Sequence, residues 1–200
     1  MRRQLVPFAL LAALLFLAPV AAKAESEFAL QLEGGISHYN RALSSSNLGG
    51  SYGARLTVTP LQILGIELGY IGSRNNINSD LANGLNASTL TTNEGYADLR
   101  LNILPGAFTP YVFGGYGLTW VSGAEVSGVP SDHTSTIPFG GGLDFNTGGF
   151  KIGGRFQYNY LFDQIFVGSN PQGVPVSVTA NKGGHTDFWT ATVVLGVSFK

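Results

Sequence analysis

The side chains best suited to chemistry in this chain are charged residues that recur every second position within apolar segments. Asp98 and Arg100 alternate with Ala97, Leu99 and Leu101. Because successive side chains of a β-strand point to opposite faces, such a segment predicts a strand with one apolar and one polar face. Eight charged residues fall on polar faces in this way: Glu33, Arg55, Glu67, Asp98, Arg100, Asp144, Lys151 and Arg155.

We expect these eight side chains to form ion pairs inside a closed structure, because an unpaired buried charge is strongly destabilising. Opposite signs fall on neighbouring segments, as for Arg55 between Glu33 and Glu67. Two functions fit such a network: a plug that holds a barrel shut, or the lining of a narrow selective pore. The plug is favoured, since side chains fill the interior of a barrel of about eight strands.

The histidines offer a weaker possibility. Three of them lie at predicted strand ends or in predicted loops: His38, His133 and His185. Ser37, His133, Ser135 and Asp187 could be imagined as a lipid-hydrolysing group, but no spacing supports a serine–histidine–acid arrangement. No two histidines have the spacing of metal ligands either. We therefore expect no catalytic residues, no cofactor and no metal.

Composition points to a membrane β-barrel rather than a cytosolic enzyme. The 200 residues include 11 Lys and Arg and 12 Asp and Glu, so the formal net charge of −1 gives no reason to expect a nucleic-acid partner. Charged residues make up 12%, about half the usual share of a soluble domain, while there are 28 glycines and 12% aromatic residues. The absence of cysteine excludes disulfides and thiolate metal sites.

The N-terminus has the three parts of a secretory signal peptide. Arg2 and Arg3 supply positive charge, residues 5–20 are apolar, and Ala22-Lys23-Ala24 is a small-x-small cleavage site. A membrane anchor is the alternative, but the apolar run is too short for a comfortable span. We expect cleavage after Ala24, with residues 1–24 as the signal peptide.

Alternation recurs along the rest of the chain at a spacing that predicts a closed barrel. Eight segments show it: residues 28–39, 50–59, 65–74, 93–103, 110–120, 136–146, 150–162 and 185–199. Their length of about ten residues suits a tilted strand that crosses a bilayer. Residues 174–178 could form a short extra strand. The prediction is an all-β fold, an eight-stranded antiparallel up-and-down transmembrane β-barrel over residues 25–200.

Long, polar connections alternate with short ones, as in outer-membrane barrels, which have short periplasmic turns and long outer loops. The loops at 75–92 and 163–184 are the surface that an extracellular ligand would meet. An even number of strands predicts both termini in the periplasm.

Aromatic residues near the outer strand ends predict a membrane boundary, because Tyr and Trp favour that interface. The expected interface residues are Tyr39, Tyr52, Tyr70, Trp120 and Trp189. Packing in the core of a secreted β-sandwich is the alternative. The low content of charged residues argues against it, because a sandwich would solvate one face of each sheet.

Three short segments carry a resemblance to the small outer-membrane β-barrel family, the OmpA-, OmpX- and OmpW-like barrels. They are 109–117 (TPYVFGGYG), 139–145 (FGGGLDF) and 194–199 (VLGVSF). The last resembles the family's C-terminal assembly signal, with Val197 and Phe199 as its apolar positions. Such barrels usually end on the aromatic residue, whereas Lys200 follows Phe199 here.

The resemblance implies a monomer in the outer membrane of a Gram-negative bacterium. Its expected partners are outer-membrane lipid, lipopolysaccharide and the barrel-assembly machinery. The expected function is structural or surface interaction through the loops, around a charge-plugged interior. A narrow pore for small solutes is the alternative, and a lipid-modifying enzyme is the least favoured.

Overall fold

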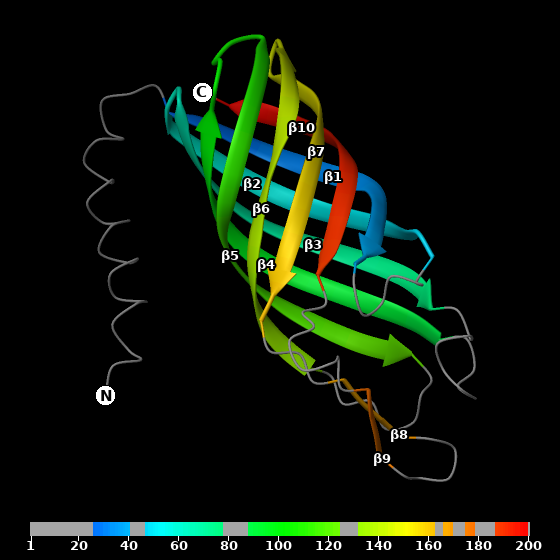
Figure 1. The fold of residues 1–200 in the computed structure, drawn as a ribbon. Coiled ribbons are helices and arrows are strands. Elements are labelled where there is room, and N and C mark those ends of the chain that lie inside the picture. Colours follow the sequence, from blue (N-terminus) through cyan, green and yellow to red (C-terminus); the bar gives the residue numbers. More distant parts are fainter. Residues whose placement is uncertain are drawn as a thin grey trace, which may run out of the picture.

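Eight antiparallel strands close into a barrel (Figure 1). The computed structural model describes residues 26–40, 47–77, 88–124, 132–162, 166–169, 175–178 and 187–199. The barrel strands are β1 (Glu27–Tyr39), β2 (Gly49–Leu61), β3 (Leu64–Ile77), β4 (Ser88–Asn102), β5 (Phe108–Ala124), β6 (Asp132–Thr147), β7 (Phe150–Leu161) and β10 (Phe188–Phe199). The predicted fold class is confirmed.

Each strand pairs with its neighbour in the sequence, and the first and last strands complete the ring. Phe28 of β1 pairs with Phe199 of β10, and Ile36 pairs with Ala191. Outside the ring, β8 (Phe166–Ser169) and β9 (Pro175–Val178) form a two-stranded sheet, so the short extra strand is also found. Within the described residues, no helix is long and apolar enough to cross a membrane.

Three short connections lie together at one end of the barrel, which we call the turn end. Between β6 and β7, Gly148 and Gly149 have φ values of 56° and 91°, a left-handed conformation that glycine adopts without steric cost. The turn between β2 and β3 is two residues long, at 62–63. The C-terminus lies at this end (Figure 1). The four long connections leave the opposite end, which we call the loop end.

The strands extend further toward the loop end than the sequence predicts. The β3–β4 ladder continues to the pair Ile77–Ser88, and the β4–β5 ladder to Thr89–Ala124. The predicted loop at 75–92 and the connection between the predicted strands 110–120 and 136–146 are therefore wrong in their bounds. Threonine and serine suit a pleated strand as well as a loop, so a polar composition concealed these strand ends.

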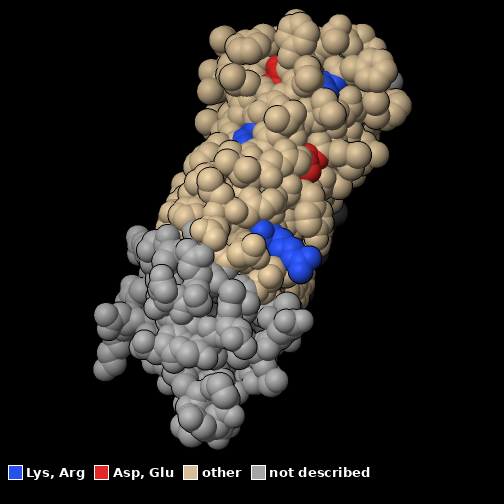
Figure 2. All heavy atoms as spheres, turned by 90° about the vertical axis from the view of Figure 1, so that its right-hand side faces the viewer, with Lys and Arg blue, Asp and Glu red and all other residues tan. Residues whose placement is uncertain are grey.

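The barrel is apolar outside and polar inside. Leu32, Leu68 and Val193 point outward and expose 64%, 55% and 59% of their surface, whereas Glu67 and Gln157 are fully buried. Figure 2 shows one side of the wall covered almost entirely by uncharged residues. A closed ring with this polarity does not fit the alternative of a secreted β-sandwich, which would bury an apolar core between two sheets.

Glycines make room for the long side chains that fill the interior. A Cβ atom at Gly69 would lie 2.2 Å from Cζ of Tyr96, and one at Gly142 would lie 2.4 Å from the hydroxyl oxygen of Tyr111. We call these positions glycine notches. Among the described residues, nine inward side chains occupy one on the adjacent strand: Gln31 at Gly196, Glu33 at Gly53, Asn75 at Gly49, Glu94 at Gly117, Tyr96 at Gly69, Asp98 at Gly115, Tyr111 at Gly142, Phe113 at Gly140 and Asp144 at Gly153.

Candidate functional site

The centre of the interior is Glu67, which contacts three arginines. Its Oε2 atom lies 2.6 Å from Nη1 of Arg155, and its Oε1 atom lies 3.2 Å from Nη1 of Arg100 and 3.5 Å from Nε of Arg55. Glu67 is on β3 and Arg155 on β7, which have three strands between them on either side of the ring. The contact therefore crosses the full width of the barrel.

Two of these arginines each bridge to a second carboxylate. Nη2 of Arg155 lies 2.9 Å from Oδ2 of Asp98, and Nη2 of Arg100 lies 2.7 Å from Oδ2 of Asp144. Both guanidinium groups also lie against aromatic rings: Arg155 is 3.3 Å from the ring centroid of Phe113, and Arg100 is 3.5 Å from that of Tyr111. Stacking and bridging together fix the planes of both groups.

The network continues toward β1 through Arg55 and Glu33. Nη1 of Arg55 lies 3.8 Å from Oε2 of Glu33, and its Nε donates to Oε1 of Gln31 at 3.2 Å. Glu33 also accepts hydrogen bonds from the hydroxyls of Tyr96, at 3.3 Å, and Thr192, at 3.0 Å. Glu33, Glu67 and the residues that contact them thus come from every strand of the barrel except β5 and β6. Those two strands contribute Phe113, which lies against Arg155, and Asp144, which pairs with Arg100.

The structure brings together seven of the eight charged residues singled out in the sequence. They are Glu33, Arg55, Glu67, Asp98, Arg100, Asp144 and Arg155, which we call the ion-pair network. Lys151 stands apart, because its Nζ pairs with Oε1 of Glu27 at 2.6 Å near the turn end. Glu27 was missed in the sequence because it precedes the predicted strand start at 28. Glu94 was missed although it shares the inward face with Asp98.

Between the ion-pair network and the turn end, the barrel contains a cavity of about 720 Å³, which we call the vestibule. Arg100 and Lys151 line it with Gln62, Asn102 and Asn146. The side-chain amide of Asn102 donates to the carbonyl of Gln62 at 2.9 Å, and that of Asn146 to the carbonyl of Gly106 at 3.0 Å. The lining is therefore polar and suited to water or a small polar solute.

At the loop end, the interior changes from polar to apolar. Five buried residues form a cluster that we call the apolar cap: Tyr39, Leu90, Val121, Leu161 and Phe188. The rings of Tyr39 and Phe188 lie 5.6 Å apart, and the Tyr39 hydroxyl hydrogen-bonds to Thr92 of β4. The prediction of Tyr39 as a membrane-interface residue is wrong. It shares the inward parity of Gln31 and is only 1% exposed.

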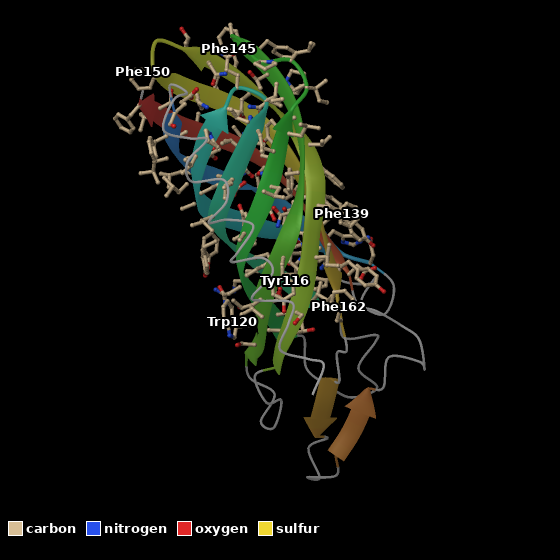
Figure 3. The ribbon with its side chains drawn as sticks, turned by 90° about the vertical axis from the view of Figure 1, so that its left-hand side faces the viewer. Tyr116, Trp120, Phe139, Phe145, Phe150 and Phe162 are labelled. Atoms are coloured by element: carbon tan, nitrogen blue, oxygen red, sulfur yellow. The ribbon has the colours of Figure 1, made fainter. Side chains whose placement is uncertain are left out.

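The other four predicted interface aromatics lie outside the ring. Tyr52, Tyr70 and Trp120 are exposed by 54%, 41% and 37%, and Trp189 stacks on Phe156 at 5.8 Å. In Figure 3, Tyr116, Trp120 and Phe162 project toward the loop end, whereas Phe145 and Phe150 project near the turn end. Aromatic side chains therefore mark both ends of the outer wall.

The serines of the imagined hydrolytic group lie on opposite faces of the wall. The Ser37 hydroxyl donates to Oδ1 of Asn75 inside the barrel, at 2.9 Å. The Ser135 hydroxyl bonds with the Tyr116 hydroxyl on the outside, at 2.7 Å. One active site cannot use both serines, because the wall separates them.

Asp187, the acid of that group, and His38, the described histidine, contact other residues than these serines. The Asp187 carboxylate accepts a hydrogen bond from the Tyr158 hydroxyl at 2.8 Å, and the ring of His38 lies 5.9 Å from that of Trp189. The side chain of His133 and all of His185 lie outside the described residues. Among the residues that the structure describes, no group of three His, Asp or Glu could hold a metal ion.

The family comparison matches nearly the whole chain. Residues 8–200 match the family described as "Outer membrane protein beta-barrel domain". No curated protein sequence is similar enough to count as a relative.

Solved structures share the fold at low sequence identity. OprG from Pseudomonas aeruginosa is 13% identical, with a TM-score of 0.63 over 88% of this chain and 97% of that one. Neisserial surface protein A is 14% identical, with a TM-score of 0.59 over 86% and 97%. Ail from Yersinia pestis is 14% identical, with a TM-score of 0.57 over 88% and 99%. With these shared folds and the family match, the apolar wall around a polar interior has a simple explanation: the chain belongs to the outer-membrane β-barrel family.

Proposed function

We propose that this outer-membrane protein is a closed anchor that presents its long loops at the cell surface. The observation that carries the proposal is the contact between Glu67 and Arg155, 2.6 Å apart from opposite walls. A network that crosses the lumen at buried, stacked guanidinium groups supports a plug more than a pore lining. The apolar cap closes the loop end a second time, since an apolar constriction excludes hydrated ions.

In this proposal the turn end faces the periplasm and the loop end faces the outside. Short turns on the periplasmic side support this orientation, which puts both termini in the periplasm. Membrane lipid and lipopolysaccharide contact the apolar outer wall. The barrel-assembly machinery engages β10 through Val197 and Phe199. A closed ring has no unpaired strand edge that needs a partner, which supports a monomer.

Surface interaction is the role we propose for the loops. Four long connections leave the same end of the barrel. Among proteins of the same fold, Ail is named an attachment invasion locus protein and has been solved with a heparin analogue, sucrose octasulfate. At such low identity that ligand is not transferred to this chain. The shared architecture supports only the general role of loops displayed on a rigid barrel.

One observation favours the alternative of a narrow pore. The vestibule of about 720 Å³ reaches Arg100, so the ion-pair network and the apolar cap are the remaining barriers. A pore would need both to open.

Recordings from planar lipid bilayers separate the two functions. We expect no unitary conductance steps from the wild-type protein, and steps only from a variant that opens both barriers by combining Glu67→Ala and Arg155→Ala with Tyr39→Ala and Phe188→Ala in the apolar cap. Glu27→Gln is the matched control, because it removes a carboxylate that pairs at the turn end without crossing the lumen. Reproducible steps from the wild type would show that the plug is wrong and that the protein is a pore.

The role of the loops needs its own test. Cells that produce the wild-type protein should adhere to surfaces coated with matrix proteins or heparin more than cells with a variant lacking residues 78–87. Equal surface amounts of both proteins must be verified first. Equal adhesion of the two strains to every surface would remove support for a role of this loop in binding.

A further inference from the structure

Glu94 is a buried carboxylate that the ion-pair network does not neutralise. It points inward from β4 and is 0% exposed, and neither of its side-chain oxygens has a hydrogen-bond partner among the described residues. Its Oε1 atom fills a glycine notch, 2.7 Å from where a Cβ atom of Gly117 would lie. A charged carboxylate without water or a donor is strongly destabilising, so Glu94 must be neutralised by a proton or by a bound cation.

The nearest arginine of the network is already engaged. Each nitrogen of Arg155 donates to another side chain: Nε to Gln157 at 3.2 Å, Nη1 to Glu67 at 2.6 Å and Nη2 to Asp98 at 2.9 Å. Asp98 itself has a second oxygen, Oδ1, that is buried without a hydrogen-bond partner in the described part of the chain. Two carboxylates of β4, four residues apart on its inward face, therefore have unused oxygens.

The net charge of the described interior also indicates that a positive charge is missing near β4. The buried acids on its strands are Glu33, Glu67, Glu94, Asp98 and Asp144, and the buried arginines are Arg55, Arg100 and Arg155; Asp187 is also buried but precedes β10 and bonds to Tyr158. Lys151 does not alter the balance, because it pairs with Glu27 near the turn end. With every group in its ordinary charged form, the interior carries two negative charges in excess.

The order of inward residues on β4 locates this excess. Leu90 belongs to the apolar cap, and Arg100 and Asn102 reach the vestibule at the other end. Glu94 and Asp98 lie between them. Across the β4–β5 ladder, Glu94 pairs with Thr119, whose hydroxyl bonds to that of Thr136 on β6. The surroundings thus supply carboxylate and hydroxyl oxygens, the ligands that hard cations prefer.

We propose that Glu94 binds a hard, oxygen-preferring cation between the apolar cap and the ion-pair network, with the charge of Asp98 further along β4 adding to the attraction. No group of three acidic or histidine ligands forms there among the described residues. Hydroxyl, carbonyl or water oxygens therefore complete the shell. Na⁺, Mg²⁺ and Ca²⁺ share this chemistry, and the experiment distinguishes them. The proposal does not depend on whether the barrel is a closed anchor or a pore.

The test compares the thermal stability of the folded barrel with different cations. The purified protein in detergent is refolded in choline chloride with a chelator and then given NaCl, MgCl₂ or CaCl₂. We expect at least one cation to raise the midpoint of the heat-dependent gel shift by about 3 °C or more. Glu94→Gln should lose this response, whereas Glu27→Gln, which changes a carboxylate near the turn end, should keep it.

A second measurement locates the cation directly and does not need the Glu94→Gln variant to fold. Wild-type crystals grown with Mn²⁺ in place of the divalent ions, or Tl⁺ in place of Na⁺, should give an anomalous peak next to Glu94. A peak only at Glu27 or on the outer surface would overturn the proposal. So would a wild-type protein whose stability is the same in choline and in all three salts.

Discussion

Glu67 and Arg155 meet across the barrel, with Oε2 and Nη1 2.6 Å apart, although their strands stand on opposite walls. Glu67 also contacts Arg55 and Arg100, so one carboxylate links four strands. Glu67 is fully buried, so removing its negative charge would leave three buried guanidinium groups with too little opposite charge nearby. Stability and closure of the barrel should therefore depend on the same side chain.

The substitution Glu67→Gln should destabilise the folded barrel by about 3–5 kcal/mol, the cost typical of breaking a buried ion pair. The free energy of unfolding can be measured by urea titration in detergent, with tryptophan fluorescence as the signal. Glu27→Gln serves as the control and should cost no more than about 1 kcal/mol, because the carboxylate of Glu27 is partly exposed. Equal effects of the two changes would contradict a central role for Glu67.

Two glycines of the wall should differ sharply in their tolerance of alanine. A Cβ atom at Gly115 would lie 2.0 Å from the carbonyl oxygen of Ala97 and 2.5 Å from Oδ1 of Asp98, whereas one at Gly50 meets nothing within 4 Å. Gly115→Ala should lower the yield of refolded barrel or the midpoint of the gel shift. Gly50→Ala should leave both unchanged. A neutral Gly115→Ala would mean that the wall shifts readily at this notch.

Single cysteines should report where water enters, since the chain has no cysteine of its own. Asn102→Cys lines the vestibule and should react with a small water-soluble thiol reagent in the folded protein. Thr136→Cys lies between the ion-pair network and the apolar cap and should react only after unfolding. Mass spectrometry of the folded and boiled proteins measures both. Rapid labelling of Thr136→Cys in the folded state would favour an open lumen.

The two tryptophans should lie near the membrane interface. Trp120 and Trp189 are the only tryptophans of the chain, and both lie on the outer wall. Fluorescence of Trp120→Phe and Trp189→Phe can be measured in bilayers with bromine at different acyl depths. Bromine close to the head groups should quench the remaining tryptophan more than bromine at the bilayer centre. The reverse order would place the loop-end aromatic residues in the hydrocarbon core.

The alternation of side chains was sufficient to predict the strands and the closed barrel, because a period of two fixes which face each residue occupies. It would also have identified Tyr39 as inward-facing had it been applied to the end of the first strand. The partner of Glu67 on the far wall could not be found in this way. That contact depends on the stagger and tilt of all eight strands, which local patterns do not contain.

The strand ends at the loop end were missed for a different reason. Residues 88–92 and 121–124 are mostly Ser, Thr, Leu, Val, Gly and Ala, types compatible with either a loop or a strand. Their pairing partners decide between the two. Lys151 illustrates the same limit, because its partner Glu27 lies just outside the alternating segment that was recognised.

The glycine notches also limit how this interior can change. Because Tyr96 occupies the space that a side chain at Gly69 would need, neither position can be altered freely without regard to the other. Enlarging the glycine requires shortening its partner, and shortening the partner alone leaves a void. We therefore expect homologues to change such residues in pairs. A designer should therefore treat each long side chain and the glycine opposite it as one unit. A wider passage would be obtained by replacing both members of such a pair together.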